Sequence, residues 1–186
     1  MAGTRAVVRK CPYCGLNEAE ELDHFLEKAL LPELALFARN LVPSCHRCNV
    51  VRGRTFDRNG RRILQFYDDR IETRGALLVA TEHFKSKDTP VLEFKTKNAM
   101  TSIGQVFCRH FAALRLESRF RKQASADLAT LRGQLGASSE TIVKKVLRND
   151  LKATNRREGA NSCRSAMLRA ILGSPKLLKW VRNVKS

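Results

Sequence analysis

The chain has 186 residues with 43% apolar content, which is enough for a folded protein with a sizeable core and argues against wholesale disorder. Its 35 Lys and Arg against 18 Asp and Glu give a formal net charge of +17 at pH 7. Such an excess indicates a polyanionic partner, most commonly nucleic acid, with anionic lipid as the alternative. No run of about 18 apolar residues occurs and MAGTRAVVRK lacks a signal-peptide core, so we expect no membrane contact and a cytoplasmic or nucleoid-associated location.

The first motifs along the chain are two Cys-x-x-Cys pairs. Their members are Cys11, Cys14, Cys45 and Cys48. Each pair places two thiolates on one tight turn, and together they complete a tetrahedral shell that suits a structural zinc ion and leaves no position for water or substrate. An iron–sulfur centre, or His46 replacing one thiolate, are the alternatives. Cys108 and Cys163 lie in helical patterns and are interpreted as buried small hydrophobic residues.

The stretch between and after the pairs predicts the order strand, loop, strand, helix. The expected elements are a strand over 22–26, a helical segment over 32–39, a strand over 41–42 and a helix over 47–53. The apolar face of the segment over 32–39 consists of Leu34, Phe37 and Ala38. Pro43 is expected to end the second strand, because proline cannot donate to a strand ladder.

Four polar residues in this stretch have the chemistry that phosphodiester hydrolysis requires. They are Asp23, His24, Asn40 and Asn49. Hydrolysis needs a base to deprotonate water and a divalent ion to hold the phosphate and the leaving oxygen. A neutral histidine with a pKa of about 6.5 suits the first task, and the oxygens of Asp23 and Asn49 suit Mg²⁺. Because side chains alternate along a strand, Asp23 and His24 should lie on different sides of it.

The strings DHFLEK, NLVPSCHRCN and RG resemble the zinc-stapled HNH endonucleases of the ββα-metal fold. The resemblance is close over residues 11–54. It is looser through the downstream hairpin and the helix at 110–120, which is similar to part of some bacterial and phage HNH proteins. It implies that His24 is the general base that activates water and that Asp23 and Asn49 hold a catalytic Mg²⁺ or Mn²⁺. It further implies that Asn40 fixes the loop so that the base faces the phosphate.

Two positions depart from the family pattern. Asn49 stands at the position of the third motif histidine, which is a common variant in the family, and its amide favours oxygen-type ligation of Mg²⁺ over softer metals. Glu27 stands where many members carry proline. We interpret Glu27 as a solvated loop acid, with an additional carboxylate near the site as the alternative.

Basic residues crowd the motif helix and the segments next to it. The candidates for contact with DNA phosphates are Lys28, Arg47, Arg52, Arg54 and Arg58. Contacts of this kind fix the position of a protein on DNA without reading its sequence. The alternative is a solvated basic surface.

The rest of the chain predicts a loop over 55–75, a β-hairpin and then helices. The hairpin strands are expected within 75–84 and 90–96, separated by the turn KSKDT. The helical patterns cover 102–136, a stretch from a cap at Ser138 or Ser139 to a break at 155–159, then 162–172 and 175–184. Trp180, Phe107, Phe111 and Phe120 are predicted to be core residues, and His83 and His110 to be structural.

The predicted fold is therefore α+β: a ββα-metal nuclease module with a four-cysteine zinc staple over 1–60, a linker and β-hairpin over 61–100, and a bundle of about four helices over 101–186. The predicted function is metal-dependent hydrolysis of DNA phosphodiester bonds, by nicking when the protein is monomeric. The helical annex serves as a DNA clamp or as a docking surface for a protein partner. Two alternatives stay open: the effector subunit of a bacterial anti-phage defence complex activated by an ATPase or sensor, and a non-catalytic zinc-finger nucleic-acid binder.

Overall fold

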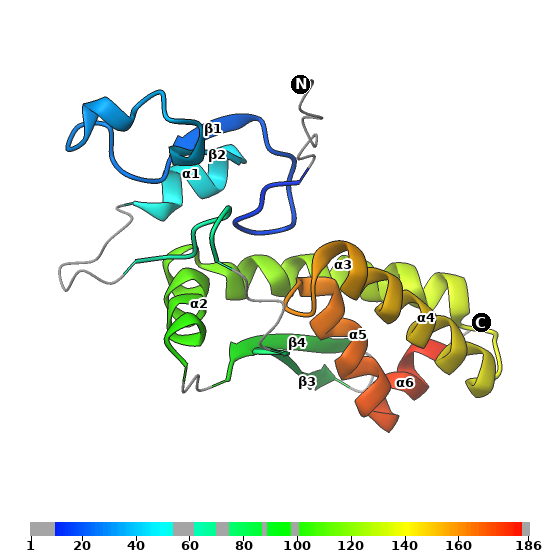
Figure 1. The fold of residues 1–186 in the computed structure, drawn as a ribbon. Coiled ribbons are helices and arrows are strands. Elements are labelled where there is room, and N and C mark those ends of the chain that lie inside the picture. The colour runs from blue at the N-terminus through cyan, green and yellow to red at the C-terminus, as the bar shows by residue number, and fades with distance from the viewer. Residues whose placement is uncertain (1–9, 54–61, 70–74, 87–88, 98–100, 184–186) are drawn as a thin grey trace, which may run out of the picture. The chain divides into compact units, whose positions relative to one another are not determined.

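A computed structural model describes residues 10–53, 62–69, 75–86, 89–97 and 101–183. Within these ranges the chain is α+β, with two small antiparallel sheets and six α-helices (Figure 1). It divides into two compact units, Met1–Asp69 with Gln105–Arg115, and Arg70–Gly104 with Leu116–Ser186. None of the helices in the described ranges has both the length and the apolar character that a membrane span requires.

The first unit contains the predicted succession of two strands and a helix. Strand β1 (Glu21–His24) pairs with β2 (Leu41–Ser44) in antiparallel register, with Asp23 opposite Val42. Strand β2 continues through Pro43, so the prediction that this proline ends the strand is wrong. The reason is the register: the Phe25 N–H donates to the Asn40 carbonyl at 2.8 Å, and the ladder bonds that follow at every second residue leave the Pro43 nitrogen at the free edge.

Helix α1 (His46–Arg52) follows the second cysteine pair and ends, as predicted, at Gly53, whose φ of 61° favours glycine. The predicted helical segment over 32–39 is wrong. It is replaced by two single 3-10 turns, η1 (Pro32–Leu34) and η2 (Ala38–Asn40), and Phe37 is 53% exposed. The Asn40 side chain donates a hydrogen bond to the Leu34 carbonyl. This side-chain hydrogen bond competes with the backbone hydrogen bonds of a helix over 32–39.

Helix α2 (Ser102–Ala113) contributes residues 105–113 to the first unit. Its His110 is buried and lies with Nε2 2.7 Å from the Tyr13 carbonyl oxygen, which is the structural role that the sequence predicted. The long helical pattern predicted over 102–136 is interrupted at Leu114 and Arg115, where Arg115 adopts a φ of 50°. The sequence therefore combined two helices into one.

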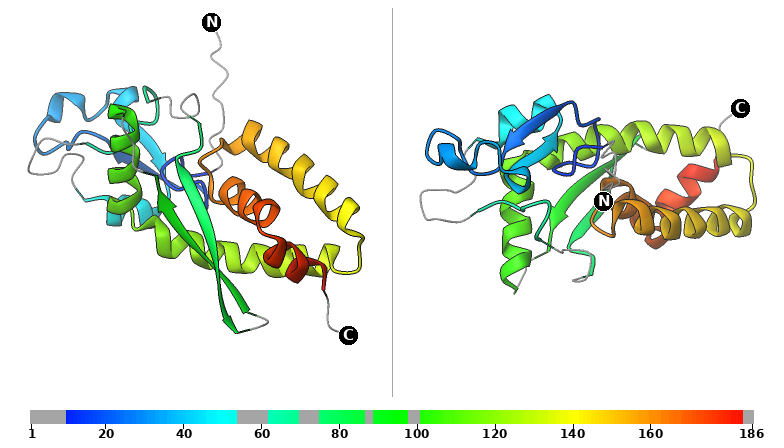
Figure 2. Two further views of the ribbon diagram at one scale, coloured as in Figure 1. Left: turned by 90° about the horizontal axis from the view of Figure 1, so that it is seen from below. Right: turned by 45° about the horizontal axis from the view of Figure 1, so that its top comes forward.

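The second unit is built on the predicted hairpin. Strands β3 (Leu78–Ser86) and β4 (Thr89–Thr96) pair in antiparallel register, and one face of this sheet buries Leu78, Leu92 and Phe94. Four helices accompany it (Figure 2): α3 (Leu116–Leu135), α4 (Glu140–Glu158), α5 (Cys163–Gly173) and α6 (Pro175–Arg182). Helix α3 contacts β4 and helix α5 contacts β3, and Phe94 meets Phe120 edge-on with ring centroids 5.6 Å apart.

The helix caps follow the sequence, but one helix face does not. Ser139 and Ser162 cap α4 and α5 by accepting a backbone N–H in the first turn. Helix α4 ends at Glu158 with Gly159 as its C-cap, which lies within the predicted break over 155–159. Its buried side carries Val143 and Leu147, whereas Ile142 is 54% and Val146 41% exposed.

Candidate active site

The four cysteines of the two pairs converge in the first unit. Their sulfur atoms all lie within 4.8 Å of one another, each residue is at most 5% exposed, and none forms a disulfide. The Sγ atoms of Cys14 and Cys45 are 3.9 Å apart. A zinc ion with Zn–S bonds of about 2.3 Å in a tetrahedron sets its sulfurs about 3.8 Å apart, so this cluster fits structural zinc.

A tight backbone turn carries the first pair of cysteines. In the first pair the N–H of Gly15 donates to the Cys11 carbonyl at 2.8 Å, and Gly15 has a φ of 66°. A hydrogen bond from Cys11 lowers the pKa of Cys14, and the same bond raises the pKa of Cys11 to about 12. A bound divalent cation would compensate the negative charge of four thiolates buried to this extent.

Asp23 and Arg52 form a buried ion pair that ties β1 to α1. Nε and Nη2 of Arg52 lie 2.6 and 2.8 Å from the two oxygens of Asp23, and the two side chains are 6% and 4% exposed. The Tyr13 hydroxyl donates to Asp23 at 2.8 Å; burial, followed by the Asp23 charge, raises the pKa of Tyr13. Arg52 also donates to the carbonyl of His24 at 2.8 Å. Arg52, predicted to contact DNA, is thus an internal brace, and both oxygens of Asp23, predicted to hold an ion, are already bonded.

His24 is half-buried and has one ring nitrogen fixed. Its Nε2 lies 3.1 Å from the carbonyl oxygen of Ala35. A carbonyl only accepts hydrogen bonds, so Nε2 carries the proton and the lone pair remains on Nδ1. Strand alternation sets His24 on the other side of β1 from Asp23. Nδ1 is therefore the ring nitrogen that is left to accept a proton.

Asn40 closes the loop that carries Ala35. Its Oδ1 accepts from the Leu26 N–H at 2.6 Å, and its Nδ2 donates to the carbonyls of Leu26 and Leu34 at 3.1 Å each. The side chain is buried, with every amide group bonded inside the loop. Asn40 holds the backbone of this loop, and the Ala35 carbonyl of the same loop orients the His24 ring, so the orientation of His24 depends indirectly on Asn40.

Asn49 contacts an acid that the sequence reasoning missed. Its Nδ2 donates to Glu21 at 2.7 Å, and Nδ1 of His46 lies 2.7 Å from the other oxygen of the same carboxylate. The hydrogen bond from Asn49, and then that from His46, lowers the pKa of Glu21. Glu21 precedes Asp23 by two positions on β1, so strand periodicity could have placed both on the face toward α1. Asn49 is thus paired with Glu21, and Asp23 with Arg52.

The remaining candidate residues divide by exposure. Lys28 and Arg47 are exposed, whereas Arg54 and Arg58 lie outside the described residues. Glu27 is half-buried, and its carbonyl accepts the N–H groups of Leu30 and Leu31 at 3.0 Å each. The exposed basic side chains of the first unit thus include two of the five predicted phosphate contacts.

Comparisons with known proteins give two partial similarities. Over 142 residues the chain is 30% identical to protein ea31 of Escherichia phage lambda, an alignment that covers 73% of this chain and 47% of that protein. Over 49 residues it is 45% identical to Septu protein PtuB of Bacillus thuringiensis, covering 24% of this chain and 19% of PtuB. The chain thus spans about half of the first relative and about a fifth of the second. No family model matches the chain, and no solved structure matches it.

Proposed function

We propose that the chain is a zinc-stapled HNH-type endonuclease that hydrolyses DNA phosphodiester bonds with His24 as general base. The observation that carries the proposal is the contact of His24 Nε2 with the Ala35 carbonyl oxygen at 3.1 Å, which leaves Nδ1 to accept a proton. This histidine stands on the first strand of a strand–strand–helix unit flanked by two cysteine pairs. The similarity to Septu protein PtuB supports the proposal as well.

In the proposed reaction, Nδ1 of His24 takes a proton from water, and the hydroxide attacks phosphorus. The bond to the 3′ oxygen breaks and that oxygen takes up a proton from solvent, which leaves a 5′-phosphate and a 3′-hydroxyl. Asn40 keeps the loop, and hence the imidazole, in place. Arg52 and Asp23 hold β1 against α1, and zinc on Cys11, Cys14, Cys45 and Cys48 holds the turns around them. Lys28 and Arg47 are exposed and suited to contact phosphate.

A catalytic Mg²⁺ or Mn²⁺, when bound at such a site, supplies the charge that stabilises the leaving oxygen. The predicted ligand pair for it was Asp23 with Asn49. Asp23 does not fit this role in the arrangement described, because an ion would have to displace Arg52 or Tyr13 from its carboxylate. Glu21 is the carboxylate that Asn49 contacts instead. Proton transfer by His24 does not depend on either pairing.

The test is nicking of supercoiled plasmid by zinc-loaded protein in Mg²⁺, in Mn²⁺ and in EDTA, with the zinc content measured in each arm. His24→Ala should lower the nicking rate by about 10²–10⁴-fold, the usual worth of a general base. His83→Ala is the matched control, because His83 is an exposed histidine on β3. Equal rates for wild type and His24→Ala would remove His24 from the mechanism. Inactive wild type with zinc and DNA bound would favour the non-catalytic binder.

A second candidate function is that of a nuclease subunit in an anti-phage defence complex, held by a protein partner through the helical region over 101–186. The similarity to Septu protein PtuB is the observation that favours it. The test is plaque formation on cells that express the wild type or His24→Ala. Protection by the wild type that is lost in the variant supports this role, whereas equal plaque counts in both contradict it.

A further inference from the structure

Helix α4 carries four exposed basic side chains in one row along its surface. This α4 basic row consists of Lys145, Arg148, Lys152 and Arg156. The spacings of three, four and four residues place all of them on one face of the helix. Val143, Leu147 and Thr154 are buried on the opposite face, and helix α5 is the principal neighbour of α4. Because α4 lies at the border of the second unit (Figure 2), the row is directed outward.

The acidic residues of α4 are bonded elsewhere. The helix contains three of them, and their ion pairs are Glu140 with Lys144 and Arg182, Asp150 with Arg164, and Glu158 with Arg157. The N–O distances of these pairs lie between 2.6 and 3.2 Å. No ion pair joins a member of the row to another residue that the structure describes. Within that part of the chain, the four charges of the row are therefore uncompensated by ion pairing.

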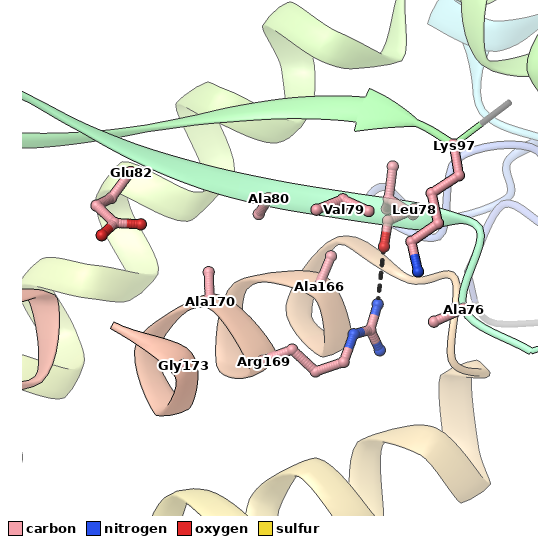
Figure 3. A pocket seen from close by; sticks show the side chains of 10 residues that line it. All are labelled: Ala76, Leu78, Val79, Ala80, Glu82, Lys97, Ala166, Arg169, Ala170 and Gly173. Atoms are coloured by element: carbon pink, nitrogen blue, oxygen red, sulfur yellow. Dashed lines mark hydrogen bonds between the residues drawn. The ribbon is translucent and has the colours of Figure 1, made fainter. Parts of the chain in front are cut away.

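The basic residues of the neighbouring helix α5 differ in this respect. Nη2 of Arg164 lies 2.6 Å from the Asp150 carboxylate, and Nη2 of Arg169 donates to the Leu78 carbonyl at 3.0 Å (Figure 3). Both side chains are engaged inside the second unit, where they join α5 to α4 and to β3. The uncompensated positive charge of this helix pair is therefore concentrated on the outer face of α4.

The row is unfavourable for the helix by itself. Arg148 and Lys152, and likewise Lys152 and Arg156, are four residues apart, and like charges at that spacing destabilise a helix. On α3 the same spacing carries opposite charges, since Arg121 pairs with Glu117 at 3.1 Å. The helix dipole favours a cation in the last turn, which accounts for Arg156 but not for the members in the first half of α4. A solvated surface needs no such alignment, whereas an anion bound along the row would remove the repulsion.

The composition and length of α4 select duplex DNA among the polyanions. Residues 140–158 include no Phe, Tyr or Trp, so the helix offers no aromatic platform on which single-stranded bases could stack. Its large exposed apolar side chains are Ile142 and Val146, which form too small an apolar face for insertion at a lipid surface. The row is about 16 Å long at a rise of about 1.5 Å per residue. One strand of duplex DNA carries a phosphate about every 3.4 Å along the axis, so the row matches about four to five phosphates.

We propose that the α4 basic row binds the phosphate backbone of duplex DNA, as a second contact surface outside the nuclease site. Each of the four side chains contacts one phosphate, and such contacts fix the position of a protein on DNA without reading its sequence. The surface lies wholly in the second unit. Binding there requires neither His24 nor the cysteine cluster, so the proposal goes beyond the nuclease chemistry.

The experiment measures the affinity of the full-length, zinc-loaded protein for a fluorescent DNA duplex of mixed sequence, without divalent ions in solution so that no cleavage occurs. The row variant carries Lys145→Gln, Arg148→Gln, Lys152→Gln and Arg156→Gln. Loss of four phosphate contacts should lower the slope of log affinity against log salt by about 3.6. Between about 50 and 200 mM salt, the wild type should therefore lose about 150-fold more affinity than the row variant. Lys152→Gln alone should lower the slope by about 0.9.

The matched control removes four exposed lysines outside the row and so changes the net charge by the same amount. It carries Lys85→Gln, Lys95→Gln, Lys122→Gln and Lys179→Gln. The control should keep the wild-type salt slope, because none of these lysines belongs to the proposed surface. The row variant should melt at the wild-type temperature or above it, since the substitutions relieve repulsion between like charges on α4.

Four outcomes overturn the proposal. Equal salt slopes for the wild type and the row variant would remove the row from DNA binding. An equal loss of slope in the control would assign the effect to net charge, and a larger loss with a thymidine oligonucleotide than with the duplex would assign the row to single strands. Loss of binding to phosphatidylglycerol vesicles in the row variant, with its DNA slope unchanged, would assign the row to anionic lipid. Because binding is measured without cleavage, failure of this surface is distinguishable from failure of the nuclease.

Discussion

The Asp23–Arg52 pair yields the sharpest prediction, because a structural acid and an ion ligand respond differently to the same substitution. Asp23→Asn leaves the Arg52 guanidinium buried at 6% exposure without its counter-charge. Removing one partner of a buried pair costs about 3–5 kcal/mol. Local opening of the β1–β2 pair should therefore become more frequent by about two to four orders of magnitude.

The assay is native-state hydrogen exchange at the Phe25 amide, which bonds to the Asn40 carbonyl across the two strands. Asp68→Asn is the matched control, because Asp68 pairs with Arg39 at the surface, where an ion pair is worth about 0–1 kcal/mol. The double variant Asp23→Asn/Arg52→Gln should cost less than the sum of its single variants, since no charge is left buried. Unchanged Phe25 exchange in Asp23→Asn, together with lost cleavage, would refute the structural role and return Asp23 to ion binding.

Three further predictions follow from the metal cluster, a buried histidine and the basic surface. Cys48→Ser should lose zinc and unfold the first unit, because the free energy of zinc binding contributes to folding there. Zinc analysis and circular dichroism measure the two effects, and an unchanged melting temperature would contradict a structural zinc site. Burial lowers the pKa of His110 to about 4 in the folded state. Between about pH 6.5 and pH 4 the unfolded state therefore binds a proton on this histidine that the folded state does not bind. The free energy of unfolding should fall by about 1.5 kcal/mol from pH 6.5 to pH 5, and by less in His110→Gln, as measured by urea unfolding. Identical pH dependence in both proteins would exclude His110 as the cause. If the region over 101–186 clamps DNA, affinity should fall steeply with salt in proportion to the phosphates contacted, and a flat dependence in a filter-binding titration contradicts a clamp.

The sequence predicted those features that depend on local chemistry. The spacing of the cysteines predicted the cluster of four sulfurs, and Gly53 predicted the end of α1. Apolar patterns and capping serines predicted the hairpin and the helices that follow it. It failed where a tertiary contact competed with a local pattern. The amide of Asn40 diverted the segment over 32–39, and Pro43 stayed in β2 because its nitrogen faces a free edge.

The same limit applies to the site. An arginine on α1 three positions after Asn49 has the sequence signature of a surface cation, and only the packing of α1 on β1 reveals that Arg52 pairs with Asp23. Glu21 was accessible to strand periodicity, since it shares a face of β1 with Asp23. The tautomer of His24 depends on the Ala35 carbonyl across the loop, and no local pattern encodes that contact.

The central claim is that His24 is the base of a nuclease, and chemical rescue tests it most directly. Single-turnover plasmid nicking is measured for the zinc-loaded wild type and for His24→Gly, with and without added imidazole. We predict that His24→Gly is slower by about 10²–10⁴-fold and that imidazole restores nicking in a saturable manner, because the freed volume accepts a base in the same place. Nicking by His24→Gly at the wild-type rate without imidazole would contradict the account.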